Sequence, residues 1–161
     1  MTERGYEMNE IKSYSEAVQY IKILLGDEFF GVDIGIIDNI VRMQRITRVP
    51  NVAPYIKGVI NLRGEIVPIM DLRLKMGLDE IEYTKATRII IIKTESYGKI
   101  GLIVDAVKEV VALEDEQIEK VPYDSTEENH FVSGVGKLEG ALISLLDIAT
   151  VLTDKQIKEE G

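Results

Sequence analysis

The chain has 161 residues, a formal net charge of −9 and a sequence pI near 4.7, so nucleic acid and anionic membrane surfaces are poor electrostatic partners. It contains no cysteine and one histidine, which excludes disulfides, thiolate nucleophiles and Cys/His zinc sites. No segment approaches the roughly 20 apolar residues of a membrane helix, and no signal peptide is evident. We therefore expect a cytoplasmic protein that does not insert into membranes.

The first half of the chain carries strand patterns separated by turn residues. After a polar segment over residues 1–17, the apolar run Gln19–Leu25, a Gly-Asp-Glu turn and the run Phe29–Ile34 are typical of a hairpin. The apolar residues between 36 and 43 fit a bent strand or a short helix about equally, and we favour the strand.

A second hairpin follows two interrupting prolines. The runs Ile56–Leu62 and Glu65–Asp71 are joined at Arg63-Gly64, where the glycine suits a tight turn. The polar stretch from Lys75 to Thr87 predicts a link between two modules.

The second half repeats this order. A strand over Ile89–Ile92, a turn and a returning strand over Ile100–Val104 predict a third hairpin, with further apolar residues up to Leu113. Residues 114–119 read as an acidic turn or a helical stub, and Pro122–His130 as a polar excursion. From Leu145 the apolar spacing predicts a C-terminal helix, which Ile157 extends.

The sequence also repeats itself directly. The stretch Ile56–Leu72 recurs as Val132–Ile148, 76 positions later, and Gly31–Met43 aligns with Gly101–Leu113 at an offset of 70. Residues shared by both copies are expected to build the scaffold. Residues that differ, such as Arg63 against Glu139, are better candidates for function.

Short strands, glycine turns and the duplication predict a mainly β fold of two small five-stranded barrels related by a pseudo-twofold axis, with a C-terminal helix. The expected first module spans 18–74, the link 75–87, the second module 88–146, and the helix and tail 147–161. An exchange of strands between the modules would make them one compact domain. Five aliphatic residues are expected to fill the interiors: Ile60, Val67, Ile69, Leu142 and Leu145.

Catalytic chemistry is nearly absent from the sequence. His130 lies in a polar run without a partner that would make it a general base. Asp71 and Asp147 are equivalent in the two copies and are expected to cap or end a turn rather than act as a carboxylate pair. The acidic clusters lack the spacing of a calcium loop. We therefore expect no enzyme activity, no metal and no cofactor.

Two features remain as functional candidates. Ile34, Ile37 and Ile40 recur at every third position, and Val107 corresponds to Ile37 in the second copy. This spacing fits a plain core about as well as a hydrophobic groove that receives a partner helix. Arg63 fits either a solvated charge or an anchor for a partner or a neighbouring loop.

A family resemblance follows from these motifs. The run YIKGVINLRGEIVPIMDLRLKMG, from Tyr55 to Gly77, resembles the signature of the CheW family of bacterial chemotaxis coupling proteins, and the similarity extends from about Gln19 to Leu152. It implies two intertwined Src-homology-type barrels and a non-enzymatic scaffold. Such adaptors connect the cytoplasmic helical hairpin of chemoreceptors to the regulatory domain of a CheA-type histidine kinase, a domain itself built like a coupling protein.

The resemblance also implies roles for individual residues. It assigns the receptor-binding groove to Ile34, Ile37, Ile40 and Val107, and the coupling turn to Asn61 and Arg63, with Asn39 as the neighbour of that arginine. The family often has a glutamate at the position of Asn39. An asparagine offers a hydrogen bond but no ion pair.

Two other functions stay open from the sequence. A carboxylate-dependent hydrolase would require Asp71 and Asp147 to converge in one pocket. Alternatively, the chain is a CheW-like module detached from a larger signalling protein, such as a receiver-fused coupling protein or the regulatory domain of the kinase.

Overall fold

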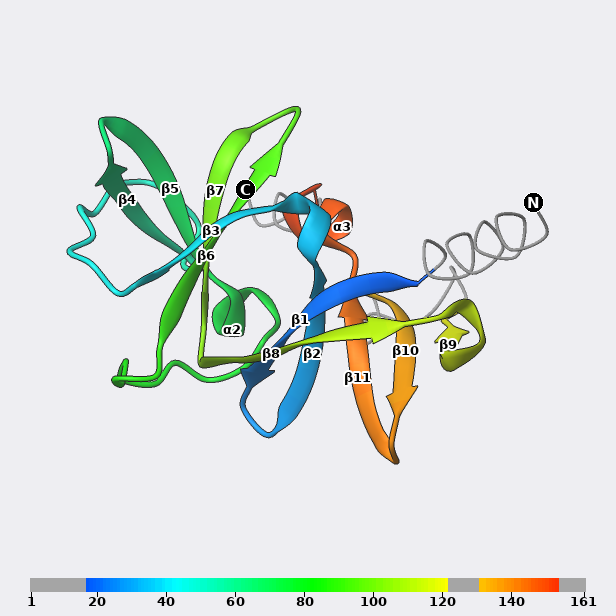
Figure 1. Ribbon diagram of the computed structural model, residues 1–161. Helices are drawn as coiled ribbons and strands as arrows, with labels where there is room; N and C mark the ends of the chain where they lie inside the picture. The colour runs from blue at the N-terminus through cyan, green and yellow to red at the C-terminus, as the bar shows by residue number, and fades with distance from the viewer. Residues whose placement is uncertain (1–16, 122–130, 154–161) are drawn as a thin grey trace, which may run out of the picture.

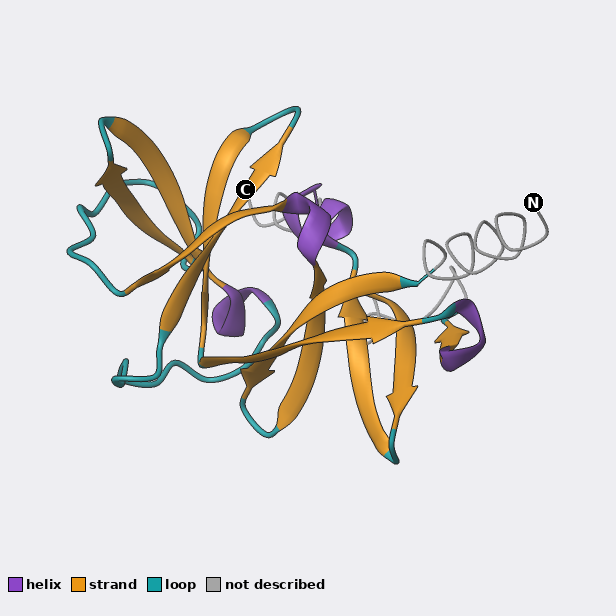
Figure 2. Ribbon diagram, in the orientation of Figure 1, coloured by secondary structure: helices purple, strands orange, loops and turns teal. Residues whose placement is uncertain are grey.

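The computed structural model describes residues 17–121 and 131–153 and shows a mainly β protein built from two sheets (Figures 1 and 2). The strands in this part of the chain are β1 (Val18–Leu25), β2 (Glu28–Asp33), β3 (Ile37–Arg42), β4 (Ile56–Leu62), β5 (Glu65–Asp71), β6 (Arg88–Thr94), β7 (Gly98–Val104), β8 (Ala106–Leu113), β9 (Ile118–Lys120), β10 (Val132–Leu138) and β11 (Ala141–Leu146). The helical elements are short: η1 (Ile34–Ile36), α2 (Leu72–Lys75), η2 (Asp115–Gln117) and α3 (Ile148–Thr153).

Each sheet combines strands from both repeats. One sheet has the order β8-β1-β2-β11-β10-β9, and the other has the order β3-β6-β7-β5-β4. The hairpin β1–β2 of the first repeat therefore completes the sheet of the second repeat, and the hairpin β6–β7 completes the sheet of the first (Figure 1). This reciprocal exchange joins the repeats through backbone hydrogen bonds.

The exchange places a glycine at the same point of each sheet. β2 pairs in parallel with β11, where Gly31 lies opposite Leu145, and β7 pairs in parallel with β5, where Gly101 lies opposite Ile69. A Cβ atom on Gly31 would lie 2.9 Å from the Leu145 side chain, and one on Gly101 would lie 2.6 Å from Ile69. The close approach of these side chains explains why both copies carry glycine there.

Backbone details confirm that the sequence repeat is structural. Asp71 N–H donates to the Tyr55 carbonyl over 2.7 Å, and Asp147 N–H donates to the Phe131 carbonyl over 2.8 Å. Phe131 lies 76 positions after Tyr55, and Asp147 lies 76 positions after Asp71.

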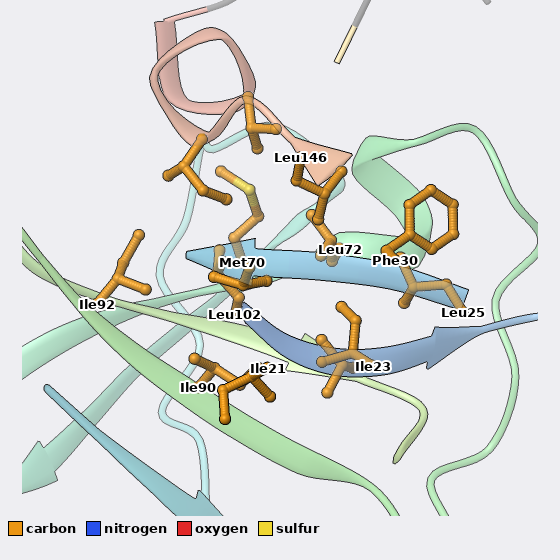
Figure 3. Packing of buried hydrophobic residues seen from close by; sticks show 14 of the residues in the cluster. Ile21, Ile23, Leu25, Phe30, Met70, Leu72, Ile90, Ile92, Leu102 and Leu146 are labelled. Carbon is orange, nitrogen blue, oxygen red and sulfur yellow. The ribbon is translucent and has the colours of Figure 1, made fainter. Parts of the chain in front are cut away.

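The largest hydrophobic cluster lies where the two sheets meet (Figure 3). It takes Ile21 and Ile23 from β1, Met70 from β5, and Ile90 and Ile92 from β6. β6 is buried on both faces, because Ile89 and Ile91 point instead into a smaller cluster within the second sheet. At about 1.5–3 kcal/mol per buried large aliphatic side chain, this joint is a major source of stability.

Most of the residues expected to fill the interiors are buried. Ile60, Val67, Ile69 and Leu145 are buried as expected, but Leu142 is 61% exposed, so its assignment to an interior was wrong. The alternation of β11 places Ile143 and Leu145 inward and turns Leu142 outward.

Some element boundaries also differ. Residues 34–42 form both expected alternatives in succession, a single 3₁₀ turn (η1) and then a strand (β3). The acidic stretch after Leu113 contains the helical stub η2, but it continues into β9, which the sequence did not predict. The C-terminal helix begins at Ile148 rather than Leu145. The excursion Pro122–His130 and the tail with Ile157 lie outside the described residues.

Candidate functional site

The predicted groove residues lie where the chain crosses between the two sheets. Ile37 and Ile40 belong to β3, Val107 belongs to β8, and all three are partly buried against the large cluster at the joint. Ile34 lies in η1 and is 36% exposed. The structure thus brings Ile37, Ile40 and Val107 onto one core and leaves part of each side chain accessible.

A bulge in β3 explains the spacing of these isoleucines. The register shifts between Ile37 and Asn39, so that Ile37 lies opposite Ile92 and Ile40 lies opposite Ile90. One extra residue at Asp38 lets positions three apart share a face, which a regular strand does not allow. Both isoleucines therefore face the same cluster.

The crossover itself is fixed by a local cap. The Asp33 carboxylate accepts a hydrogen bond from Gly35 N–H over 2.8 Å and caps η1. This single helical turn redirects the chain from β2 in one sheet to β3 in the other. In the second repeat, Asp105 lies at the corresponding bend between β7 and β8, just before Val107.

The turn predicted to serve in coupling has a defined geometry. Arg63 has a φ of 54°, and the Asn61 side chain accepts a hydrogen bond from Gly64 N–H over 3.0 Å. Arg63 is exposed, and within residues 17–121 and 131–153 no ion pair or hydrogen bond of its side chain is present. The side-chain Oδ1 of Asn39 accepts a hydrogen bond from Ile40 N–H over 2.8 Å.

A different ionic link occupies this region. The Lys99 ammonium lies 3.0 Å from Glu65 and 3.5 Å from Asp38, and so connects β7 with both β5 and β3. The Glu65 carboxylate, assisted by Asp38, raises the pKa of Lys99. Lys99 carries no signal in the sequence, because nothing in the local pattern shows which strands lie side by side.

The two equivalent aspartates serve their own helices. Asp71 Oδ1 accepts a hydrogen bond from Leu74 N–H over 3.3 Å, and Asp147 Oδ1 accepts one from Thr150 N–H over 3.3 Å. Their expected role as caps is confirmed. No group of three or more potential metal ligands occurs in the described ranges.

Two exposed aliphatics were not predicted as such: Ile66 was not singled out, and Leu142 was assigned to an interior. Ile66 on β5 and Leu142 on β11 are 62% and 61% exposed, and they are 76 positions apart. The sequence repeat indicates these two positions, because both hairpins carry a large apolar residue at the same place.

No helix in the described ranges has the length and apolar character needed to cross a membrane.

Comparison with known proteins gives a consistent result. The CheW-like domain family matches residues 19–156. The chain is 34% identical over 142 residues to the chemotaxis protein CheW of Klebsiella aerogenes, covering 86% of this chain and 84% of that protein. It is also 34% identical over 153 residues to the CheW of Bacillus subtilis, covering 94% and 95% of the two chains.

A solved structure agrees with these matches. The crystal structure of the scaffolding protein TtCheW from Thermoanaerobacter tengcongensis superposes with a TM-score of 0.78 at 33% sequence identity. The match covers 85% of this chain and 93% of the other.

Proposed function

The chain belongs to the CheW-like domain family of non-enzymatic chemotaxis scaffolds, and from that premise we propose that it couples the cytoplasmic tips of chemoreceptors to a CheA-type histidine kinase. The observation that carries the proposal is that Ile37, Ile40 and Val107 pack on one core at the joint of the two sheets and stay partly accessible. Such an adaptor works in the cytoplasm, where the receptor tips and the kinase meet.

The receptor contact is assigned to Ile34, Ile37, Ile40 and Val107. A helical hairpin presents apolar side chains at helical spacing, and these insert best into a surface whose own side chains are half-buried and rigidly held. Three of these side chains meet that requirement because they pack on the large cluster: Ile37, Ile40 and Val107. Ile34, three residues before Ile37 in the chain, adds exposed apolar area.

Arg63 is assigned to coupling. It stands at a tight turn with a φ of 54°, and its guanidinium group has five donors that suit a carboxylate of a partner. In family relatives with a glutamate at the position of Asn39, an internal ion pair would occupy this arginine. In this chain the asparagine leaves Arg63 without that pair.

The kinase contact is assigned to the two hairpin ends. Each end carries an exposed aliphatic, Ile66 on one and Leu142 on the other, at equivalent positions of the repeat. Because the regulatory domain of the kinase is built like a coupling protein, an end of one molecule can meet the opposite end of the other in a head-to-tail contact.

Coupling then requires no reaction catalysed by this chain. A rigid body that holds receptor and kinase in fixed register transmits a shift at the receptor through contacts that differ between kinase states.

The receptor contact is tested with Ile34→Asp. This residue is exposed, so the variant should keep its fold while binding to a receptor-tip fragment weakens at least about tenfold, as for loss of an interface anchor. Isothermal calorimetry measures the affinity, and circular dichroism checks the fold.

Leu142→Asp serves as the matched control, because it also places a carboxylate on an exposed aliphatic position. It should leave receptor binding unchanged and weaken binding of the isolated kinase regulatory domain. If both Ile34→Asp and Ile37→Asp kept the receptor affinity unchanged, the assignment of these residues to the receptor-binding groove would be wrong.

A further inference from the structure

One lysine connects the strand of the receptor-binding groove to the turn assigned to coupling. The Lys99 ammonium lies 3.5 Å from Asp38 Oδ2 and 3.0 Å from Glu65 Oε1. Asp38 belongs to β3, the strand that also carries Ile37 and Ile40. Glu65 is the first residue of β5. A single side chain of β7 therefore contacts both strands.

The contact with Asp38 is made at the bulge of β3. The register between β3 and β6 shifts between Ile37 and Asn39, so Asp38 is the extra residue at that point. The extra residue of a bulge has no partner across the ladder, and its position therefore depends on what its side chain contacts. The ion pair with Lys99 thus holds the residue whose insertion lets Ile37 and Ile40 face one cluster.

The contact with Glu65 is made at the residue that closes the coupling turn. Glu65 pairs with Leu62 across the hairpin β4–β5, and only Arg63 and Gly64 lie between them. The Asn61 side chain fixes the turn from the other strand, through the hydrogen bond from Gly64 N–H. In so short a turn, a displacement of Glu65 has to be taken up by the backbone angles of Arg63 and Gly64.

Lys99 is the ionic connection between these strands in the part of the chain that the structure describes. β6 lies between β3 and β7 in the sheet, so Lys99 reaches past β6 to Asp38. Lys93 lies opposite Lys99 in the β6–β7 pairing but makes no ion pair within the described residues. Over residues 17–121 and 131–153, no other side chain joins β3 to the hairpin β4–β5 through ion pairs.

These ion pairs act on position rather than on folding. The three side chains are partly exposed, by 34% for Lys99, 27% for Asp38 and 58% for Glu65. Ion pairs that water reaches contribute little to the free energy of unfolding, because solvation and side-chain entropy offset the attraction. A cation shared by two carboxylates still favours the arrangement in which both lie within its reach.

We propose that Lys99 is a positioning residue that transmits small displacements of the β3 bulge to the coupling turn. A partner that displaces Ile37 and Ile40 also displaces Asp38, which lies between them in the chain. The Lys99 ammonium follows Asp38, and the Glu65 carboxylate follows the ammonium. The orientation in which the turn presents its arginine then depends on what the groove holds. The inference rests on the receptor and coupling contacts proposed above and names the residue that connects them.

Amide chemical shifts of the purified chain test this connection without any partner. Asp38→Asn keeps the shape of the side chain and removes its charge. It should shift the amide signals of Arg63 and Gly64 in a proton–nitrogen correlation spectrum. In a Lys99→Met background the ammonium is absent while the apolar stem remains, so Asp38→Asn should no longer shift these signals.

The reverse experiment starts from the other carboxylate. Glu65→Gln should shift the amide signals of Ile37 and Ile40, and this effect should also be lost in the Lys99→Met background. Lys99→Arg keeps a cation whose planar fork suits two carboxylates, so the transmitted shifts should return in that background. A side chain that served packing alone would not restore them through its charge.

Lys93→Met is the matched control, because Lys93 is exposed, carries the same charge and lies opposite Lys99. Both transmitted shifts should persist in this background. Urea unfolding of Lys99→Met and of Lys93→Met should give nearly the midpoint of the unmodified chain, which checks that the fold is kept.

Three results would overturn the proposal. Transmitted shifts could persist in Lys99→Met, they could be absent in both Asp38→Asn and Glu65→Gln, or they could be lost equally in Lys93→Met. An incorrect receptor assignment would leave all these spectra as expected. It would appear instead as unchanged receptor affinity in Ile34→Asp, so the two failures are distinguishable.

Discussion

At the scale of single residues, Gly58 is the position that tolerates a side chain least. Its φ is 141°, and a Cβ atom there would lie 2.0 Å from the carbonyl oxygen of Thr47. Gly58→Ala must break the bridge between Thr47 and Val59, so we expect a loss of about 3 kcal/mol or more in the free energy of unfolding, measured with urea.

Gly64→Ala is the control for this prediction. Gly64 also has a positive φ, 86°, but no atom lies within 4 Å of the added Cβ. Only the backbone strain remains, which amounts to about 1–2 kcal/mol. Equal losses in the two variants would show that the contact with Thr47 is not the cause.

The hydrogen bond of Tyr83 predicts that the stability of the fold depends on pH. Its hydroxyl donates to the buried Asp71 carboxylate over 3.0 Å, and burial, together with this carboxylate, raises the pKa of Tyr83 above its ordinary value of 10.0. The folded state thus holds the phenol proton more tightly than the unfolded state. This contribution to stability is complete below pH 10 and declines as the pH rises toward the higher folded value.

Tyr83→Phe tests this dependence. The stability difference between the unmodified chain and the variant should shrink between pH 9 and pH 12, as measured by chemical unfolding at each pH. Tyr97→Phe, at an exposed tyrosine whose hydroxyl makes no hydrogen bond within the described residues, should show no such trend. A constant difference for Tyr83→Phe would argue against the bond to Asp71.

Single positions could be predicted from the sequence where the repeat constrains them. Asp71 and Asp147 were assigned as caps because both copies carry them, and the structure confirms this. Leu142 was placed inside because it is apolar, but apolarity does not reveal which face of a strand a residue occupies. The partners of Lys99 depend on contacts between distant strands and left no local pattern.

At the scale of elements, the exchanged strand β7 is held by tight packing at Gly101. Gly101→Ala should destabilise the fold, because the new Cβ would lie 2.6 Å from Ile69 Cδ1 and 2.7 Å from Ile89 Cγ2. Ile69→Val removes the first of these atoms. We measure the free energy of unfolding of each variant with urea in a double-mutant cycle. We expect the double variant to be more stable, by at least about 0.5 kcal/mol, than the sum of the two single losses predicts.

Ile60→Val supplies the comparison for this cycle. Ile60 lies in the same small cluster as Ile69 but is not among the nearest neighbours of a Cβ on Gly101. Its effect should add to that of Gly101→Ala. Coupling of similar size in both cycles would point to a general loosening of the cluster rather than to this contact.

Strands and hairpins were the part of the fold that the sequence predicted well. Their turns carry glycine and their strands carry consecutive β-branched residues, as in Ile89–Ile92. The bulge at Asp38 was not predicted, and it is the reason why the spacing of Ile37 and Ile40 resembled a helix as much as a strand. β9 escaped notice because three residues within an acidic stretch give no periodic signal.

At the scale of the whole molecule, the local sequence pattern does not reveal which sheet receives each hairpin. β1–β2 and β6–β7 both carry a glycine at the contact with the neighbouring parallel strand, so this feature alone does not distinguish the two possible places of each hairpin. The chain crosses between the sheets through η1 and β3 in one repeat and at the bend at Asp105 in the other. Only the full structure shows these paths.

The exchange predicts how the molecule behaves when it is cut in the link. A fragment ending at Glu80 keeps β1–β5, but in it β3 has lost its partner β6 and β5 has lost its partner β7. The fragment beginning at Ile81 lacks β1, the partner of β8, and β2, the partner of β11. We expect each fragment alone to show no cooperative unfolding transition, and an equimolar mixture to recover one, followed by circular dichroism.

The contrary result would also be informative. If a single fragment unfolded cooperatively, a hairpin of the same fragment would have taken the place of the exchanged one, either within one monomer or between two copies as in domain swapping. Sedimentation of that fragment would then separate a monomer from a swapped dimer. Because the large cluster draws on both repeats, a lone fragment would have to leave Met70 and Leu72, or Ile90 and Ile92, without the side chains that cover them here, and this favours recovery only on mixing.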